Sequence, residues 1–168
     1  KQWEKYDVWP AVKATVKLTF DNGRKLVVNG ATNPAIKFSY ISDPDNPVPY
    51  TSQIEALSFT PRTFMSDDQR QASKRPDVLT FETDTLTEDF TLSGEILAKL
   101  KVAITGTDAD FMVKLIDVYP DNHPNYDHNP KNVKMGGYQQ LVRSEVFRGR
   151  FRNSFEKPEP LTPDKNTE

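Results

Sequence analysis

Short runs in which apolar and polar residues alternate dominate the chain. The clearest run is residues 14–20, where Ala, Val, Leu and Phe take every second position between Thr and Lys. A period of two is typical of a strand that buries one face. The Asn22-Gly23 pair that follows accepts the positive φ of a tight turn. Residues 26–28 therefore predict the returning strand of a hairpin whose apolar face is buried.

The same alternation predicts further strands and hardly any helix. These strands cover residues 36–40, 78–82, 90–96, 100–104, 111–119 and 138–147. Residues 111–119 are apolar on both faces except at Lys114 and Asp117, which favours a central strand. Ser66, with Gln69 three positions later, predicts the N-cap of one short helix. Many short strands separated by turn signals predict an all-β jelly-roll β-sandwich.

We expect one β-sandwich domain over residues 1–168, with three irregular segments. Residues 1–13 predict an N-terminal arm, residues 42–74 a long irregular loop, and residues 154–168 an extended tail. Prolines interrupt the loop and the tail, because proline lacks a backbone donor and restricts the preceding residue. A loop of this length in a compact domain is usually functional or packs on a partner.

The N-terminal arm is rich in aromatic residues. Trp3, Tyr6 and Trp9 fall within its first ten positions. Packing against the arm's own domain is the slightly favoured interpretation, because aromatic side chains mostly fill cores. The alternative is an arm that docks on a neighbouring domain.

Composition narrows the class of protein. The chain has 168 residues, 36% of them hydrophobic, with a formal net charge of −2. That balance gives no electrostatic attraction to nucleic acid or to an anionic membrane, and no apolar run is long enough for a transmembrane helix. Cysteine is absent, which excludes disulfides and thiolate chemistry but does not identify the compartment.

The residues provide no self-contained catalytic site. A serine hydrolase needs a nucleophile, a histidine base and an orienting acid. Here the only histidines, His123 and His128, share one polar loop. Ser93-Gly94 lacks the first glycine of a nucleophile elbow and falls in a predicted strand. We therefore predict no catalytic residue in this chain.

Two acidic groups suggest metal ligands only weakly. Asp121 and Asp127 flank the histidines, but the spacing matches no established zinc pattern, so a solvated loop is favoured. Gly106, Asp108 and Asp110 resemble part of a calcium loop that lacks its central glycine and distal glutamate. A turn in which aspartate binds the backbone is favoured there. We predict no metal or cofactor, although the Asp108/Asp110 turn leaves a bound metal open.

Charged residues in the predicted strands suggest structural ion pairs. Asp117 is flanked by apolar residues, so it is expected to be buried and to need a partner. Arg143, Arg148 and Arg150 are the candidates, and a pair with one of them would make Asp117→Asn costly to stability. The arginines of residues 143–152, which include Arg152, favour a salt-bridge set at an interdomain or sandwich edge over nucleic-acid binding, because Glu145 and an acidic pI oppose the latter.

Several motifs in order resemble one protein family. They are WEKYDVWP, SDPDNPVPY, FMSDDQRQASKRPDVLTFET, GTDADFMVKLIDVYPD and GGYQQLVRSEVFRGRFRNSFEKPEPLTP, at residues 3–10, 42–50, 64–83, 106–121 and 136–163. Together they resemble the C-terminal jelly-roll domain of X-Pro dipeptidyl-peptidase and cocaine-esterase-like serine hydrolases. Within these, the likeness to α-amino acid ester hydrolases and glutaryl-cephalosporin acylases is strong.

The resemblance implies a fold and a partner. It implies a galactose-binding-like β-sandwich that packs on an α/β-hydrolase catalytic domain of the same parent chain and helps to wall its active-site cleft. The triad positions of the family have no counterpart in this chain. The family's further strands after residue 163 are also missing, so we expect a jelly roll that lacks its last strands, left open or completed by another copy in a homo-oligomer. Export to the periplasm or medium is a further expectation from the resemblance.

A carbohydrate-binding module of the same sandwich fold is the alternative. Tyr50, Tyr119, Tyr126 and Tyr138 are the aromatic residues that would be exposed to stack on sugars. The accessory-domain interpretation is favoured, because fold alone does not establish a binding function.

Overall fold

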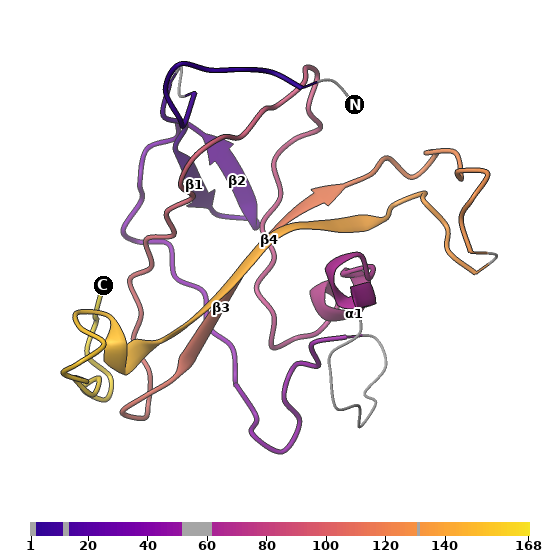
Figure 1. The fold of residues 1–168 in the computed structure, drawn as a ribbon. Coiled ribbons are helices and arrows are strands. Elements are labelled where there is room, and N and C mark those ends of the chain that lie inside the picture. Colours follow the sequence, from indigo (N-terminus) through magenta and orange to yellow (C-terminus); the bar gives the residue numbers. More distant parts are fainter. Residues whose placement is uncertain (1–2, 12–13, 52–61, 131) are drawn as a thin grey trace. The chain divides into compact units, whose positions relative to one another are not determined.

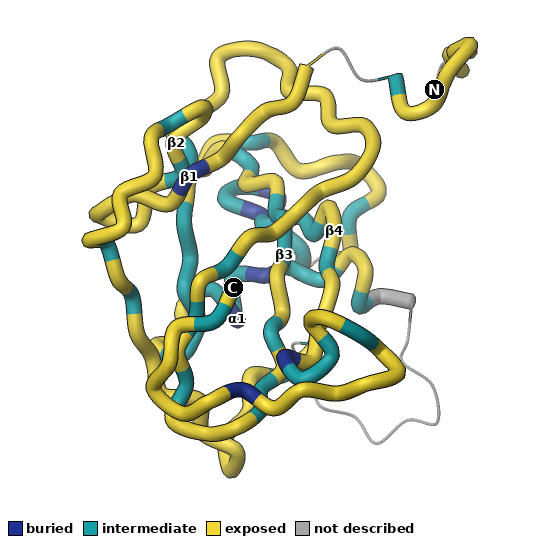
Figure 2. The backbone as a smooth tube through the Cα atoms, turned by 90° about the vertical axis from the view of Figure 1, so that its left-hand side faces the viewer, coloured by how far each residue is buried: buried dark blue, intermediate teal, exposed yellow. Residues whose placement is uncertain are grey.

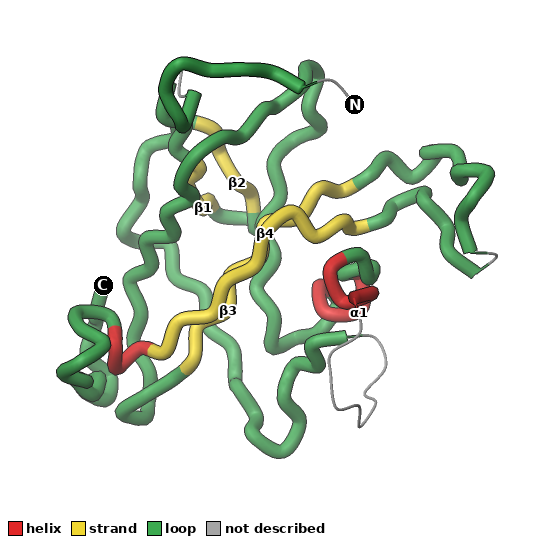
Figure 3. Tube along the Cα trace, viewed as in Figure 1, coloured by secondary structure: helices red, strands yellow, loops and turns green. Residues whose placement is uncertain are grey.

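The computed structural model describes residues 3–11, 14–51, 62–130 and 132–168. The chain divides into two compact units. Figure 1 shows the helices and strands as a ribbon, and Figure 3 colours the chain by secondary structure. Unit 1 comprises residues 1–46 and 76–97, and unit 2 comprises residues 47–75 and 98–168. Each unit is therefore assembled from two separate segments of the chain. The expectation of one domain over residues 1–168 stays a prediction.

A β-hairpin is the regular element of unit 1. Strand β1 (Leu18–Asp21) pairs antiparallel with β2 (Lys25–Val28), and Asp21 lies opposite Lys25 at the end of the ladder. The connecting turn contains Gly23 at φ 79° and Arg24 at φ 62°. Glycine adopts this left-handed region at no steric cost. The hairpin predicted from alternation and from the Asn-Gly pair is thus confirmed.

The burial of β1 differs from the sequence-based expectation. Thr19 is the buried residue, and its hydroxyl donates to the carbonyl of Gly30 over 2.9 Å. Phe20 keeps 42% of its surface exposed even though its ring lies 4.3 Å from that of Phe81. Of the strand predicted at residues 14–20, only the end that begins at Leu18 forms a ladder. The covered face is that of the hydrogen-bonded threonine and not the predicted apolar face.

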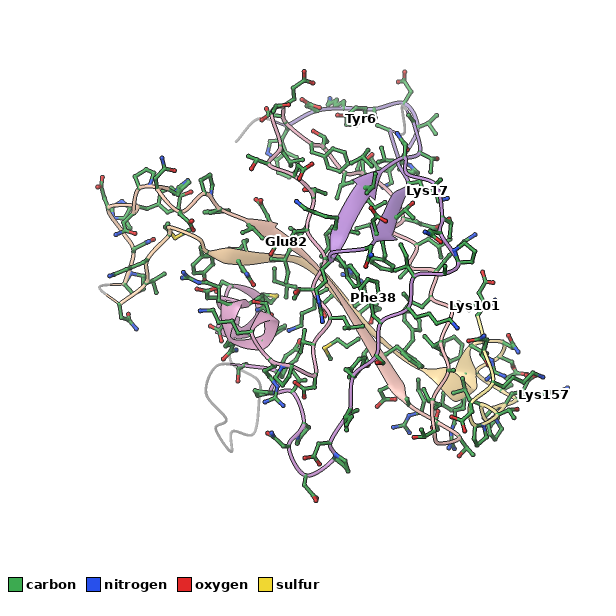
Figure 4. The ribbon with its side chains drawn as sticks, turned by 180° about the vertical axis from the view of Figure 1, so that it is seen from behind. Tyr6, Lys17, Phe38, Glu82, Lys101 and Lys157 are labelled. Carbon is green, nitrogen blue, oxygen red and sulfur yellow. The ribbon has the colours of Figure 1, made fainter. Side chains whose placement is uncertain are left out.

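Three predicted strands of unit 1 are extended chain rather than ladder strands. Within the described residues, 36–40, 78–82 and 90–96 form no regular strand. Glu82 makes a single parallel bridge to Lys25. The ring of Phe38 packs edge-on against Phe81 at 4.9 Å, and Figure 4 labels Phe38 and Glu82 among the side chains. Alternation indicates extended backbone, whereas a ladder also needs a hydrogen-bonded neighbour.

A long antiparallel ribbon organises unit 2. Strand β3 (Asp110–Val118) pairs antiparallel with β4 (Gln139–Arg148). The sequence predicted both strands, at residues 111–119 and 138–147, but not that they pair with each other. A bulge lies between Leu115 and Ile116, where Val142 of β4 has no partner. Among the described residues β3 pairs with β4 alone, so its expected central position in a sheet is not seen.

In the part of the chain that the structure describes, helix is confined to short pieces of unit 2. They are η1 (Arg62–Met65), α1 (Arg70–Ser73) and η2 (Gly149–Phe151). The prediction that Ser66 caps the helix is wrong, because α1 begins after Gln69, which makes no side-chain cap. The Ser66 carbonyl instead accepts a hydrogen bond from the Tyr138 hydroxyl. No described helix is long and apolar enough to cross a membrane.

The C-terminal tail is an ordered part of unit 2. Thr167 forms an antiparallel bridge with Val102, and the Leu161 amide donates to the Thr107 carbonyl over 2.7 Å. Leu161 is only 4% exposed, one of the few buried residues marked in Figure 2. The tail is extended only in part, because it turns at residues 163–164, where Asp164 has φ 59°. It supplies backbone partners to residues 100–104, which were predicted as a strand and form a single bridge at Val102.

Candidate functional site

A buried glutamine organises the polar groups between α1 and the β3–β4 ribbon. Gln69 is 2% exposed. Its side-chain Nε2 donates to the Asp67 carbonyl, and its Oε1 accepts from the Lys114 ammonium, both over 2.7 Å. Its backbone amide donates to Gln139 on β4 over 3.1 Å. Burial lowers the pKa of Lys114, so this glutamine oxygen partners a half-buried cation.

Arg70 connects the same helix to the start of β4. Its guanidinium lies 2.5 Å from the Asp68 carboxylate and donates to the Gly136 carbonyl over 3.1 Å. Asp68 also accepts a hydrogen bond from the Gln139 amide over 3.3 Å. The hydrogen bond to Asp68 raises the pKa of Arg70. We call Asp68, Gln69, Arg70 and Lys114 the α1 cluster.

A pocket of about 390 Å³ lies beside the α1 cluster, within unit 2. The residues that line it include Asp67, Asp68, Arg70, Lys134, Gly136 and Tyr138. The Asp68 carboxylate is already paired with Arg70, and Tyr138 donates to Ser66. The lining residues therefore place no nucleophile next to a base, and the Asp68 and Arg70 side chains hold α1 in place.

The two histidines lie in the long loop that joins β3 to β4. His123 Nδ1 lies 2.8 Å from the Pro124 carbonyl, and its ring packs 4.9 Å from Tyr119 and 5.5 Å from Tyr126. His128 is exposed. In the part of the chain that the structure describes, no three His, Asp or Glu side chains come together as a metal-binding group. The partly buried ring, that of His123, belongs to an aromatic cluster with Tyr119 and Tyr126, which we call the His123 cluster.

The arginines after residue 143 form the expected salt-bridge set. Arg150 Nε lies 2.5 Å from Asp108, and Arg148 Nε lies 2.8 Å from Asp110. Arg152 approaches Glu159 at 3.6 Å. The Asp108 carboxylate also accepts the Arg150 backbone amide over 3.1 Å. The two aspartates that resembled a calcium loop are therefore arginine partners, with Asp110 at the start of β3.

Asp117 is not the buried anchor that its apolar neighbours predicted. It is exposed on β3, opposite Gln140. Its proposed partners pair elsewhere, since Arg143 contacts Glu145 at 3.1 Å and Arg148 and Arg150 contact the aspartates before β3. The alternating pattern could not show that the C-terminal end of β3, where Asp117 lies, is exposed to solvent.

Replacing Asp117 with asparagine is therefore expected to leave the melting temperature almost unchanged. An exposed carboxylate with no ion pair among the described residues loses little when its charge is removed. Thermal unfolding followed by circular dichroism measures this. A clear fall in melting temperature would restore the buried-anchor interpretation.

The N-terminal arm leaves its aromatic side chains uncovered. Trp3 is 96% exposed and Trp9 is 69% exposed, while Tyr6 lies 6.1 Å from Trp9. Figure 4 labels Tyr6 on this arm. The interpretation that the arm packs on its own domain is wrong for the described residues. Exposed aromatic surface of this kind is typical of an interaction site.

The four tyrosines proposed for a carbohydrate platform do not form one surface. Tyr138 is 8% exposed. Tyr50 is exposed, with its ring tilted 5.2 Å from that of Phe64, and Tyr126 is the exposed member of the His123 cluster. The carbohydrate-binding alternative stays a prediction, without the set of exposed rings on which it was based.

Sequence reasoning missed the α1 cluster. Two of its members, Gln69 and Lys114, are hydrogen-bonded although 45 positions separate them in the sequence. One signal was present, since Lys114 interrupts an apolar strand. A lysine at such a position needs an acceptor, because an unpaired buried cation is costly.

The chain is similar to known proteins over its whole length. Residues 1–168 match the family profile described as the X-Pro dipeptidyl-peptidase C-terminal non-catalytic domain. Cocaine esterase from Rhodococcus sp. (strain MB1 Bresler) is 39% identical over 83 residues, which is 49% of this chain and 14% of that protein.

Two solved structures share the fold. An aminopeptidase from a marine sediment archaeon, Thaumarchaeota archaeon, matches 99% of this chain and 27% of its own with a TM-score of 0.80 and 37% identity. An alpha-amino acid ester hydrolase matches 90% of this chain and 24% of its own, with a TM-score of 0.70 and 37% identity. The likeness confirms the predicted all-β jelly-roll class, and the chain spans about a quarter of each solved chain.

Proposed function

Because the chain belongs to the family of X-Pro dipeptidyl-peptidase C-terminal non-catalytic domains, we propose that it packs on an α/β-hydrolase catalytic domain of the same parent chain and helps to wall the active-site cleft. The family resemblance predicted from the sequence motifs is confirmed. The chain is a non-catalytic C-terminal domain of a serine-hydrolase-like protein. Its docking and its part in the cleft are the proposal.

The exposed arm carries this proposal. Two tryptophans that are 96% and 69% exposed would be costly to leave in water, because burying an aromatic side chain is worth about 2 kcal/mol. Trp3, Tyr6 and Trp9 lie within seven positions of one another. A neighbouring domain that covers them would gain rigid apolar contact area at little cost in side-chain entropy.

The reaction class of the parent follows from its relatives by analogy. The names of the similar proteins are those of an esterase, an aminopeptidase and an amino acid ester hydrolase. All three names describe enzymes that cleave the bond between an acyl carbon and an oxygen or nitrogen, as found in an ester or an amide. We infer the same class for the parent, with the serine, histidine and acid on the catalytic domain.

The isolated chain is expected to show no hydrolysis of aminoacyl esters or X-Pro amides. The described residues place no nucleophile beside His123 or His128. Chromogenic substrates of both kinds, assayed with and without added catalytic domain, test this. Turnover by the chain alone that disappears in His123→Ala or His128→Ala would contradict a non-catalytic role.

Tryptophan fluorescence tests the docking directly. The chain has two tryptophans, both in the N-terminal arm, so subtracting the emission of the catalytic domain alone leaves the emission of that segment. Adding the parent's catalytic domain should shift emission to shorter wavelength as the rings leave water. Trp3→Ser should reduce the shift, and Trp9→Ser should reduce it too, while Phe155→Ser, an exposed control in the tail, should not. Unchanged emission in a complex that forms would exclude the arm as the contact.

A further inference from the structure

The chain contains two Asn-Gly pairs, and both lie in unit 1. They are Asn22-Gly23 in the turn between β1 and β2, and Asn29-Gly30 just after β2. Both asparagines are exposed. The two sites share the same Asn-Gly pair and differ in conformation and hydrogen bonding. They can therefore be compared within one molecule.

The first pair is held in a reactive arrangement. The Gly23 amide nitrogen lies 3.2 Å from Oδ1 of the Asn22 side chain, so it adjoins the carbonyl group that it would attack. Gly23 has φ 79°, and no atom lies within 4 Å of the place where a Cβ would be. Proximity of the reacting groups without steric obstruction is what accelerates an intramolecular reaction.

The second pair is held away from reaction. Oδ1 of Asn29 accepts the Lys17 amide over 3.2 Å, and the Asn29 amide donates to the Lys17 carbonyl over 2.6 Å. The Gly30 amide donates to Val27, whose Cβ would lie 2.9 Å from a Cβ at Gly30. Figure 4 labels Lys17 beside the hairpin. Attack at Asn29 therefore requires these hydrogen bonds to break first.

We propose that Asn22 is a site of spontaneous deamidation in the folded protein and that Asn29 is protected from it. The Gly23 nitrogen loses its proton and forms a bond to Cγ of Asn22, and the side-chain amide leaves as ammonia. The resulting cyclic imide is opened by water at either carbonyl, which gives aspartate or isoaspartate. No oxidant or reductant takes part, and water is the only co-reactant.

The modification would change the hairpin in two ways. Each product adds a negative charge at position 22. This charge is next to Asp21, which lies opposite Lys25 in the ladder. Isoaspartate also places an extra methylene in the main chain of a turn of three residues. Because register in a hairpin is set by the length of its turn, that product would disturb the β1–β2 pairing.

Mass spectrometry of the aged chain tests the proposal. The chain is incubated at mildly alkaline pH and digested with trypsin, which places the two pairs in separate peptides, residues 18–24 and 26–37. The first peptide should gain the mass of deamidation about tenfold faster than the second, since the second must break hydrogen bonds to react. A methyltransferase specific for isoaspartate should label the first peptide.

Two controls make the result decisive. In urea, which removes the structural difference, both peptides should react at similar rates. Asn22→Gln should abolish the mass gain in the first peptide, because the six-membered imide ring that glutamine would form closes much more slowly. Equal rates in the folded chain, a faster second peptide, or no reaction at Asn22 would each overturn the proposal.

Discussion

Replacing Gln69 with leucine is expected to lower the free energy of unfolding by about 3 kcal/mol, because a buried hydrogen-bond network would lose its central member. Leucine nearly preserves the volume, so the cost comes from the polar groups left behind. The Lys114 ammonium would lose its acceptor at 2.7 Å, and the Asp67 carbonyl would lose its donor. Urea denaturation followed by far-ultraviolet circular dichroism measures the change.

Lys114→Met tests whether the cation causes that cost. Combined with Gln69→Leu, it should recover most of the lost stability, because an apolar pair of similar volume replaces a charge without a partner. A double variant as unstable as Gln69→Leu alone would show that the leucine itself does not fit. If the loss in the double variant equals the sum of the losses in the two single variants, the substitutions are additive and the α1 cluster is not one network.

The Gln69→Leu defect should also shrink as pH rises. Burial holds the pKa of Lys114 below its ordinary value of 10.5, and loss of the Gln69 acceptor should lower this pKa further in the variant. Below that lowered pKa the lysine is charged in both folded and unfolded chains, and the full cost is present. As pH rises through that lowered pKa, Lys114 loses its proton in the folded chain before it does in the unfolded chain, so folding is favoured.

The local pattern of the sequence was sufficient to locate the two hairpin-like elements. Alternation placed β3 and β4 almost to their ends, and the Asn22-Gly23 pair located the turn of unit 1. These features depend on neighbouring residues alone, since strand period and turn conformation are local properties. The family motifs, which are also linear, led to the correct family.

Burial and pairing could not be obtained in the same way. Asp117 has apolar neighbours in sequence but is exposed, while Thr19 is polar and buried. Both outcomes depend on what covers a strand face, which the strand itself does not encode. Many apolar side chains of this chain are exposed, as Trp3 illustrates at 96%. Our proposal that a catalytic domain covers part of this surface accounts for an apolar pattern that has no matching core among the described residues.

The burial and pairing of Asp108 also depend on residues that are distant in the sequence. Its replacement is the second large effect on stability that we predict. Its carboxylate accepts the Arg150 amide and lies 2.5 Å from Arg150 Nε and 3.8 Å from Arg148 Nε. Only 17% of the Asp108 side chain is exposed. Asp108→Ala is expected to cost about 2 kcal/mol, less than a fully buried pair because both arginines reach solvent.

Asp110→Ala is the matched control two residues away. Asp110 also binds an arginine, Arg148 at 2.8 Å, but 51% of its side chain is exposed, so screening by water should make its loss much smaller. The hydrogen bond from Arg148 lowers the pKa of Asp110 below 3.8, so its contribution is present above that value and disappears as pH falls through the lowered pKa. Equal losses in the two variants, measured by urea denaturation at neutral pH, would mean that charge alone matters. A larger loss at Asp108 would show that its bond to the Arg150 backbone fixes the end of β4 against the turn before β3.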